Sequence, residues 1–208
     1  MARAFTETEK ERIRAALIRA MSESISEKGL KKTSIDHVVK AARISKGAFY
    51  LFYDSKEMLV LDAIRSVQDV ARTRLLKLLE PPRKNPTEII ARFVAGLFDV
   101  FEEFPFMKEI AKADVMTDLL RSLPEEAIEK EYESDEHFFE SFHRKLLEGK
   151  IIRDLDKKVV AGLPRMILAL IMNRQMIGVD RFNKLKALLI AGISKELTYK
   201  RPRGGAET

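Results

Sequence analysis

A short stretch at residues 45–50 has the residue types that can read base edges in double-stranded DNA. Gly47 and Ala48 are small enough to let the backbone approach the bases, and the Ala48 methyl could touch a thymine methyl. Lys46 adds a polar side chain, and Tyr50 can donate a hydrogen bond to a phosphate while its ring packs below. We therefore expect a short recognition helix that enters the major groove.

The residues before this stretch predict a partner helix and a tight turn. Thr33 or Ser34 would cap a helix over about residues 34–42, and Ser45 would cap the next one, over about 46–52. Phe49 points inward in this arrangement, as do Ile35, Val38, Val39, Ala42, Ile44 and Phe52. Two short helices joined by a tight turn after a longer helix form a helix-turn-helix.

Helical periodicity continues along the rest of the chain, so we expect an all-α protein of about nine helices. The first helix would end at Gly29 in the left-handed conformation. Breaks are expected at Pro81-Pro82 and Phe104-Pro105, and the tail from Lys200 is expected to be disordered. The expected ranges are about 8–28, 34–42, 46–52, 56–79, 86–103, 106–120, 124–149, 156–176 and 180–199. Residues 1–55 would form the helix-turn-helix domain and residues 56–208 an effector-binding and dimerisation domain.

Charge and composition agree with a nucleic-acid partner for the first quarter of the chain. Residues 1–56 hold 12 Lys or Arg against 7 Asp or Glu, or +5, whereas the whole chain carries +6. The chain has no cysteine, no phosphate-binding glycine loop and no apolar run near the length of a membrane span. These observations favour a cytoplasmic protein with no membrane partner and no cofactor.

These motifs resemble the TetR family of transcriptional repressors over roughly residues 8–60. The resemblance rests on the stretch 29–35, on 38–50 and on 52–59, where turn glycine, caps, recognition-helix residues and the Ser55-Lys56-Glu57 opening fall at family spacing. It implies a homodimer that binds a palindromic operator and is released by an apolar or amphipathic small molecule. One position departs from the family, because Arg43 stands where the family turn usually has glycine, so the turn either does not need a positive φ or Arg43 tolerates one.

The resemblance also implies roles for individual residues. Thr33 would bind phosphate at the start of the second helix, Lys46 and Tyr50 would line the groove, and Lys56 would hold the DNA backbone. Arg43 would add a phosphate contact. The full expected DNA-binding set is Thr33, Ser34, Arg43, Ser45, Lys46, Gly47, Ala48, Phe49, Tyr50 and Lys56. The structural alternative is that the hydroxyl residues are ordinary helix caps and the lysines ordinary solvated charges.

Aromatic and methionine side chains in the second part of the chain predict an adaptable apolar pocket, although core packing explains many of them equally well. The expected ligand-binding residues are Phe98, Phe101, Met107, Met116, Phe138, Phe142, Met166 and Leu170. The last two long helices are apolar on several sides, which together with the resemblance predicts a two-fold dimer. The expected interface residues are Val160, Ile167, Ile171, Leu185, Leu189, Gly192 and Ile193.

Other interpretations stay open at this point. The acidic residues of 125–140 would be a solvated face or would select a cationic effector. His137, Glu140 and His143 are poorly aligned for one metal ion, so no metal site is expected. The rival functions are an activator or an effector-independent regulator, an all-helical enzyme, for which no catalytic constellation is visible, and a structural interaction module.

Overall fold

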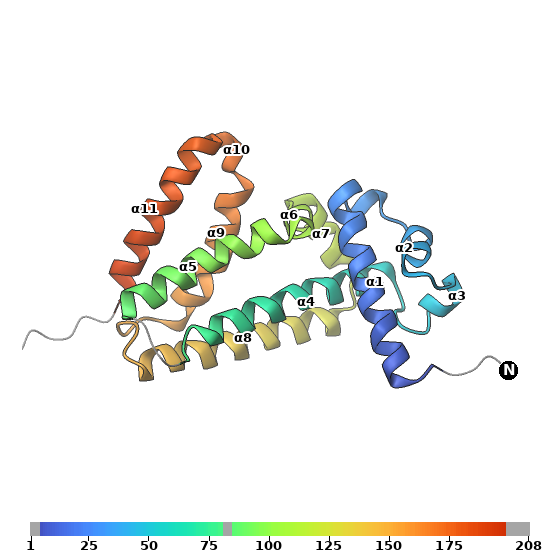
Figure 1. Ribbon diagram of the computed structural model, residues 1–208, viewed down its shortest axis with the longest axis horizontal. Coiled ribbons are helices and arrows are strands. Elements are labelled where there is room, and N and C mark those ends of the chain that lie inside the picture. The colour runs from blue at the N-terminus through green and yellow to red at the C-terminus, as the bar shows by residue number, and fades with distance from the viewer. Residues whose placement is uncertain (1–4, 81–84, 199–208) are drawn as a thin grey trace, which may run out of the picture. The chain divides into compact units, whose positions relative to one another are not determined.

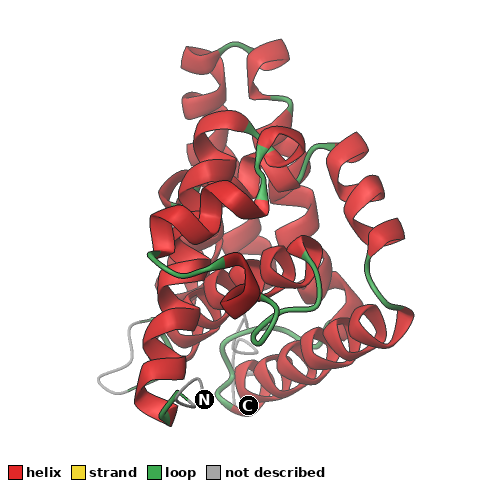
Figure 2. Ribbon diagram, turned by 90° about the vertical axis from the view of Figure 1, so that its right-hand side faces the viewer, coloured by secondary structure: helices red, strands yellow, loops and turns green. Residues whose placement is uncertain are grey.

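Helices make up every regular element of the computed structural model, which describes residues 5–80 and 85–198 (Figure 2). One isolated antiparallel bridge pairs Ile152 with Thr198. This all-helical architecture confirms the expected fold class. The elements are α1 (Glu7–Lys28), the 3-10 turn η1 (Leu30–Lys32), α2 (Ile35–Ala42), α3 (Lys46–Phe49), α4 (Lys56–Lys77), α5 (Pro86–Glu103), α6 (Pro105–Ile110), α7 (Ala113–Ser122), α8 (Glu125–Glu148), α9 (Lys157–Met172), α10 (Arg174–Ile177) and α11 (Val179–Leu197).

The helices divide into two compact units. The first, here called the N-terminal unit, comprises Met1–Val70 and Phe101–Glu129, and the second, the C-terminal unit, comprises Ala71–Val100 and Lys130–Thr208. The division does not fall at residue 55, because α4, α5 and α8 each begin in one unit and end in the other.

Helix α1 organises the first part of the N-terminal unit. Thr6 and Glu9 form a capping box, in which the Thr6 hydroxyl accepts from the Glu9 backbone N–H and the Glu9 carboxylate accepts from the Thr6 N–H. Leu17, Met21 and Ile25, which are spaced four residues apart on one face of α1, are buried. Helix α2 lies against α1, and α3 lies against α2 (Figure 1).

Gly29 ends α1 in a different conformation from the expected left-handed one. Its φ is +79° and its ψ 161°, so the backbone leaves the helix extended while φ stays positive. A residue with a Cβ rarely adopts that φ, which explains a glycine here. Gly29 leads directly into η1, a turn that was not expected.

The helix expected at residues 106–120 is interrupted, and this prediction was wrong. Phe106 and Ile110 are buried on α6, and Val115 and Leu119 are buried on α7. Each pair is four residues apart, but Ile110 and Val115 are five apart. In a continuous helix that step would turn the second pair about 140° away from the first. The extended backbone at Lys112 (ψ 133°) restores the common direction.

The C-terminal unit has a core of aromatic and aliphatic side chains. The Phe93 ring on α5 packs 5.4 Å from the Phe142 ring on α8, and the Phe98 ring lies 6.2 Å from the Phe182 ring on α11. Since Phe93, Phe98 and Phe142 are nearly inaccessible, they anchor α5 to its neighbours.

The single helix expected over residues 156–176 is also two helices. Helix α9 ends at Met172, where the Asn173 side-chain amide donates to the Ala169 carbonyl at 2.8 Å. That bond competes with the helical backbone pattern, as asparagine amides commonly do. Four residues of α10 follow, and Gly178, with φ +86°, turns the chain into α11. Pro164 lies inside α9.

Two further expectations, the break at Pro81-Pro82 and the tail from Lys200, lie outside the described residues. Within residues 5–80 and 85–198, no helix combines the length and apolar character needed to cross a membrane.

Candidate functional site

The turn between α2 and α3 has the geometry of a Schellman motif. The Ile44 N–H donates to the Val39 carbonyl at 3.0 Å, and the Arg43 N–H donates to the Lys40 carbonyl at 3.3 Å. Arg43 occupies the left-handed conformation, with φ 58° and ψ 41°. The turn therefore requires a positive φ, and an arginine adopts it where the family usually has glycine.

Helix α3 presents one polar face to solvent and buries the other. Ser45 caps it, since its hydroxyl accepts from the Ala48 N–H at 3.1 Å. Phe49 is fully buried and packs edge-on to the Tyr50 ring at 5.3 Å. Lys46, Gly47 and Tyr50 are exposed, with half of the Tyr50 surface accessible.

Two of the expected DNA-contacting residues are instead internal. The Thr33 hydroxyl donates to the Gly29 carbonyl at 3.0 Å and lies 3.1 Å from the Ser24 hydroxyl, and Thr33 is 3% exposed. The Thr33 hydroxyl is therefore almost entirely buried and is engaged by two partners inside the protein. Phe49 has no exposed surface either, so it positions α3 from beneath.

The start of α4 is held against the helix-turn-helix by Lys56. Its ammonium donates to the carbonyls of Leu30 at 3.4 Å and Thr33 at 3.3 Å, which satisfies the end of η1. An ammonium has three donors, so the group that was expected to bind the DNA backbone also has this internal role.

A second anchor joins α4 to the chain that follows α3. The Tyr53 phenol donates to the Asp62 carboxylate at 2.5 Å, and its ring packs 5.9 Å from Phe49. Burial raises the pKa of Tyr53 well above its ordinary value, and the hydrogen bond to Asp62 adds to the shift. The phenol therefore stays neutral and remains a donor at physiological pH.

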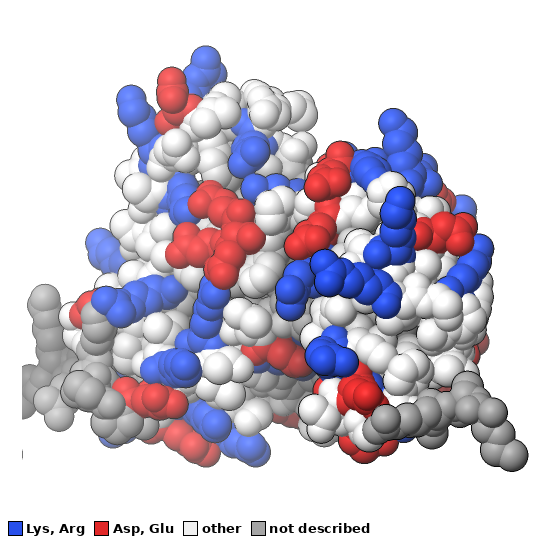
Figure 3. Space-filling model, turned by 45° about the vertical axis from the view of Figure 1, so that its right-hand side comes forward, with Lys and Arg blue, Asp and Glu red and all other residues white. Residues whose placement is uncertain are grey.

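Exposed cations lie on η1, on α2 with its C-cap, and at the start of α3 in the N-terminal unit. Lys31, Lys32 and Lys40 are accessible together with Arg43 and Lys46. The Lys46 ammonium lies 3.1 Å from the Asp36 carboxylate, and both side chains are largely solvated. Lys and Arg side chains stand on the face of this unit seen in Figure 3, with Asp and Glu side chains between them.

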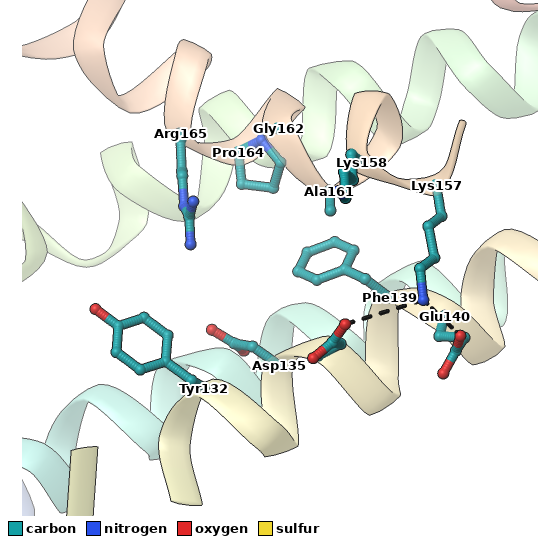
Figure 4. Close-up of a pocket in the computed structure, with 11 residues that line it drawn as sticks. Tyr132, Asp135, Phe139, Glu140, Lys157, Lys158, Ala161, Gly162, Pro164 and Arg165 are labelled. Atoms are coloured by element: carbon teal, nitrogen blue, oxygen red, sulfur yellow. Dashed lines mark hydrogen bonds and ion pairs between the residues drawn. The ribbon is translucent and has the colours of Figure 1, made fainter. Parts of the chain in front are cut away.

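The C-terminal unit contains a pocket of about 480 Å³ between α8 and α9 (Figure 4). Tyr132 and Phe139 line it from α8, and Ala161, Gly162 and Pro164 line it from α9. Its charged lining residues are Asp135, Glu136, Glu140, Lys157, Lys158 and Arg165.

The expected ligand-binding residues do not line this pocket. Phe98 and Phe142 are core side chains, and Phe138 stacks on Phe142 with ring centroids 5.8 Å apart. Phe101, Met107 and Met116 belong to the N-terminal unit, whereas Met166 and Leu170 lie on α9 outside the pocket lining. Sequence reasoning did not name the residues that line this pocket, and the available signal was a group of cations at 157–165 in addition to the acidic stretch of 125–140.

Ion pairs join the two walls of the pocket. The Lys157 ammonium lies 2.6 Å from the Glu140 carboxylate and 3.9 Å from that of Glu136. The hydrogen bond from Lys157 lowers the pKa of Glu140 below its ordinary value and raises that of Lys157 in return. Asp135 pairs with Arg72 of α4 at 2.6 Å. In the described part of the chain, no group of three or more His, Cys, Asp or Glu side chains is placed to hold a metal ion.

Comparisons with known proteins agree with the helix-turn-helix. Residues 17–63 match the model of the bacterial regulatory proteins, tetR family. A TetR-family regulator from Mesorhizobium loti has 26% sequence identity and a TM-score of 0.60, covering 90% of this chain and 95% of its own. The segment 17–63, which runs from α1 into α4, is therefore similar to the DNA-binding part of tetR-family regulators. A TetR-family regulator from Rhodococcus sp., at 17% identity, covers 90% of this chain and all of its own with a TM-score of 0.67, and so shows the fold alone.

Curated relatives named as HTH-type transcriptional regulators match part of the chain. The HTH-type transcriptional regulator YuxN of Bacillus subtilis is 36% identical over 70 residues, which is 34% of this chain and 23% of YuxN. This chain therefore aligns with about a quarter of that relative's length.

The TetR-type dimer residues expected from the sequence fall into two groups. Val160, Ile167 and Ile171 are buried within the single chain, where they pack into its core. Leu185 and Gly192 are exposed, and Leu189 and Ile193 are half-buried. The exposed apolar residues of α9, α10 and α11 include Val159, Met166, Met176, Leu185 and Leu188.

Proposed function

We propose that this protein is a transcriptional regulator that binds double-stranded DNA through α3. The observation that carries the proposal is the two-faced character of this helix. Buried Phe49 holds it from below, while Lys46, Gly47 and Tyr50 face solvent on a surface rich in cations. Gly47 would let the backbone of α3 approach the base edges in a major groove, and the polar side chains of Lys46 and Tyr50 would contact bases or phosphates.

Dimerisation would supply the second recognition helix. Leu188 on α11 is 68% exposed and Met176 on α10 is 87% exposed, which are unusual values for large apolar side chains. A second copy of the chain would cover this surface and give an isologous two-fold dimer. Its two α3 helices would read a palindromic site with half-sites about 34–36 Å apart.

The regulator acts, on this proposal, as a repressor that a small apolar or amphipathic molecule releases from its operator. Release requires that the molecule bind the free form more tightly than the DNA-bound form. The pocket between α8 and α9 supports an effector, because its volume falls within the range of ligand sites. An activator of the same fold would differ in output, which a reporter gene with the regulator deleted distinguishes.

The DNA-binding proposal is tested with sites that the protein itself selects from random duplexes. We expect Lys46→Ala to weaken binding and to reduce the slope of log affinity against log salt by about one. Tyr50→Phe should weaken binding while leaving the fold intact, since only the exposed hydroxyl is lost. Lys184→Ala, which removes an exposed cation on α11, is the matched control. Unchanged affinity in Lys46→Ala and Tyr50→Phe would refute the placement of the recognition helix.

A further inference from the structure

The acidic side chains that line the α8–α9 pocket form ion pairs, whereas two of its basic side chains do not. All three acidic residues have a basic partner, because Glu136 and Glu140 share Lys157 and Asp135 is bound by Arg72. Across residues 5–80 and 85–198, by contrast, neither Lys158 nor Arg165 forms a salt bridge. The charge left for a ligand is therefore positive, although the α8 wall is rich in carboxylates.

The unpaired cations stand beside an apolar surface. Arg165 points from α9 across the pocket toward α8, on the side where Tyr132 lies (Figure 4). Phe139 lies opposite Ala161 and Pro164, which gives the pocket a flat, mostly carbon-lined section. Gly162 adds free space, since a Cβ built there would meet no atom within 4 Å.

We propose that this pocket binds an amphipathic organic anion, with its apolar body between Phe139 and Pro164 and its carboxylate at Arg165 and Lys158. A guanidinium matches a carboxylate with two parallel hydrogen bonds, which favours the anion over a neutral isostere. The claim that such an anion acts as the effector rests on the proposed regulatory function. The claim that the anion binds in the pocket is independent of that function.

The acidic stretch of α8 favours a cationic ligand when it is read alone. The ion pairs reverse that interpretation, because a cation would have to displace Lys157 or Arg72 from its partner before it met a free carboxylate. The low pKa of Glu140 follows from the same contact and shows that its charge is engaged.

The experiment titrates the full chain by calorimetry with three probes of one shape: naphthoate, naphthylmethanol and naphthylmethylammonium. We expect naphthoate to bind at least tenfold more tightly than either of the others. Arg165→Gln should reduce naphthoate affinity about tenfold and leave naphthylmethanol affinity nearly unchanged. Lys184→Gln, an exposed cation outside the pocket, should alter neither.

A second variant protects the test against misfolding of the first. Gly162→Leu adds a side chain at a position that lines the pocket, where a Cβ would meet no atom within 4 Å, so it should abolish binding of all probes while the helical circular dichroism is retained. The proposal would be overturned by equal affinity for the three probes or by a preference for the ammonium. It would also be overturned if neither Arg165→Gln nor Gly162→Leu changed the affinity for naphthoate.

Failure of the regulatory function has a separate signature. Selected DNA is titrated with the same protein in the absence and presence of naphthoate. Absence of DNA binding with intact naphthoate preference contradicts the proposed function and leaves the pocket assignment standing. DNA binding with no naphthoate preference contradicts only the pocket assignment.

Discussion

Arg43, the C-cap of α2, has a strained backbone conformation that the residues within α2 do not share. It is one of two non-glycine residues with positive φ in the described part of the chain, the other being Lys150. The left-handed region places Cβ close to the following carbonyl and costs roughly 1–2 kcal/mol for such residues. An arginine that is retained at a strained position is a candidate for a functional contact. Arg43 is exposed and lies two residues before Ser45, the N-cap of α3.

We therefore expect Arg43→Gly to raise the free energy of unfolding by about 0.5–1 kcal/mol, because relief of strain exceeds the greater chain entropy of glycine. Urea denaturation measures this change. The same variant should bind selected DNA less tightly if the guanidinium contacts phosphate.

Lys40→Gly is the control for Arg43→Gly, since it introduces glycine inside α2 and should lower stability by about 1 kcal/mol. A destabilised Arg43→Gly protein would show that the arginine makes stabilising contacts in the folded state that outweigh its φ.

Thr33 illustrates the opposite case, a polar side chain whose importance is internal. We expect Thr33→Val to lower the free energy of unfolding by about 1–3 kcal/mol, because the buried Ser24 hydroxyl loses its partner. Affinity for selected DNA and its salt slope should remain unchanged under conditions where the protein is folded. A stable variant with a salt slope smaller by one would instead return Thr33 to the phosphate-binding set.

At the scale of the element, α7 is tied to η1 by charge. The Lys31 ammonium lies 3.1 Å from the Asp114 carboxylate and 3.3 Å from that of Asp118, all within the N-terminal unit. The hydrogen bond from Lys31 lowers the pKa of Asp114 below its ordinary value of 3.8. These groups are solvated, so their effect on stability is small.

Lys31→Ala should raise the pKa of Asp114 toward its ordinary value, as measured by carboxyl NMR titration. Because the folded-state pKa is depressed, the contribution of this pair is present above the ordinary pKa and is lost as the pH falls through the folded one. Lys32→Ala, which removes a neighbouring exposed lysine, should leave the Asp114 pKa unchanged. An equal shift in both variants would indicate a general charge effect rather than this contact.

Helix boundaries were predictable where a chemical signal marks them. Ser34, Ser45 and Ser55 each cap a helix as expected, because a hydroxyl at that position satisfies a free backbone N–H. The breaks at Lys112 and Asn173 were missed because neither glycine nor proline marks them. The five-residue step from Ile110 to Val115 was visible in the sequence and would have revealed the first.

The functional residues divide in the same way. The short helix α3 was predictable because the residues that cap it and bury it are contiguous and specifically spaced. The pocket was not, because its walls come from segments such as Tyr132–Glu140 and Lys157–Arg165 that only tertiary packing brings together. Which charged side chains of the pocket form ion pairs also depends on tertiary packing and could not be predicted from the sequence.

At the scale of the whole molecule, the apolar surface of α9–α11 predicts an assembly. Leu188→Glu should raise the dimer dissociation constant about a hundredfold, since it places two like charges near a two-fold interface. The protomer should remain folded, because Leu188 is largely exposed within it. Sedimentation over a concentration series measures the change, and operator affinity should fall with it.

Leu120→Glu is the matched control for the assembly. It changes an exposed leucine of α7, outside the proposed interface, and should leave the dimer intact. If Leu188→Glu also remains dimeric, the two copies must meet through another surface.

Helix α9 contributes to two different surfaces. Ala161 and Arg165 face the pocket, whereas Val159 and Met166 belong to the exposed apolar surface. If occupation of one surface shifts the helix, the two equilibria are linked, and each must change the other by the same factor. The apparent affinity for a ligand would then vary with protein concentration, so that the cell's own supply of the protein would set the ligand level at which it responds.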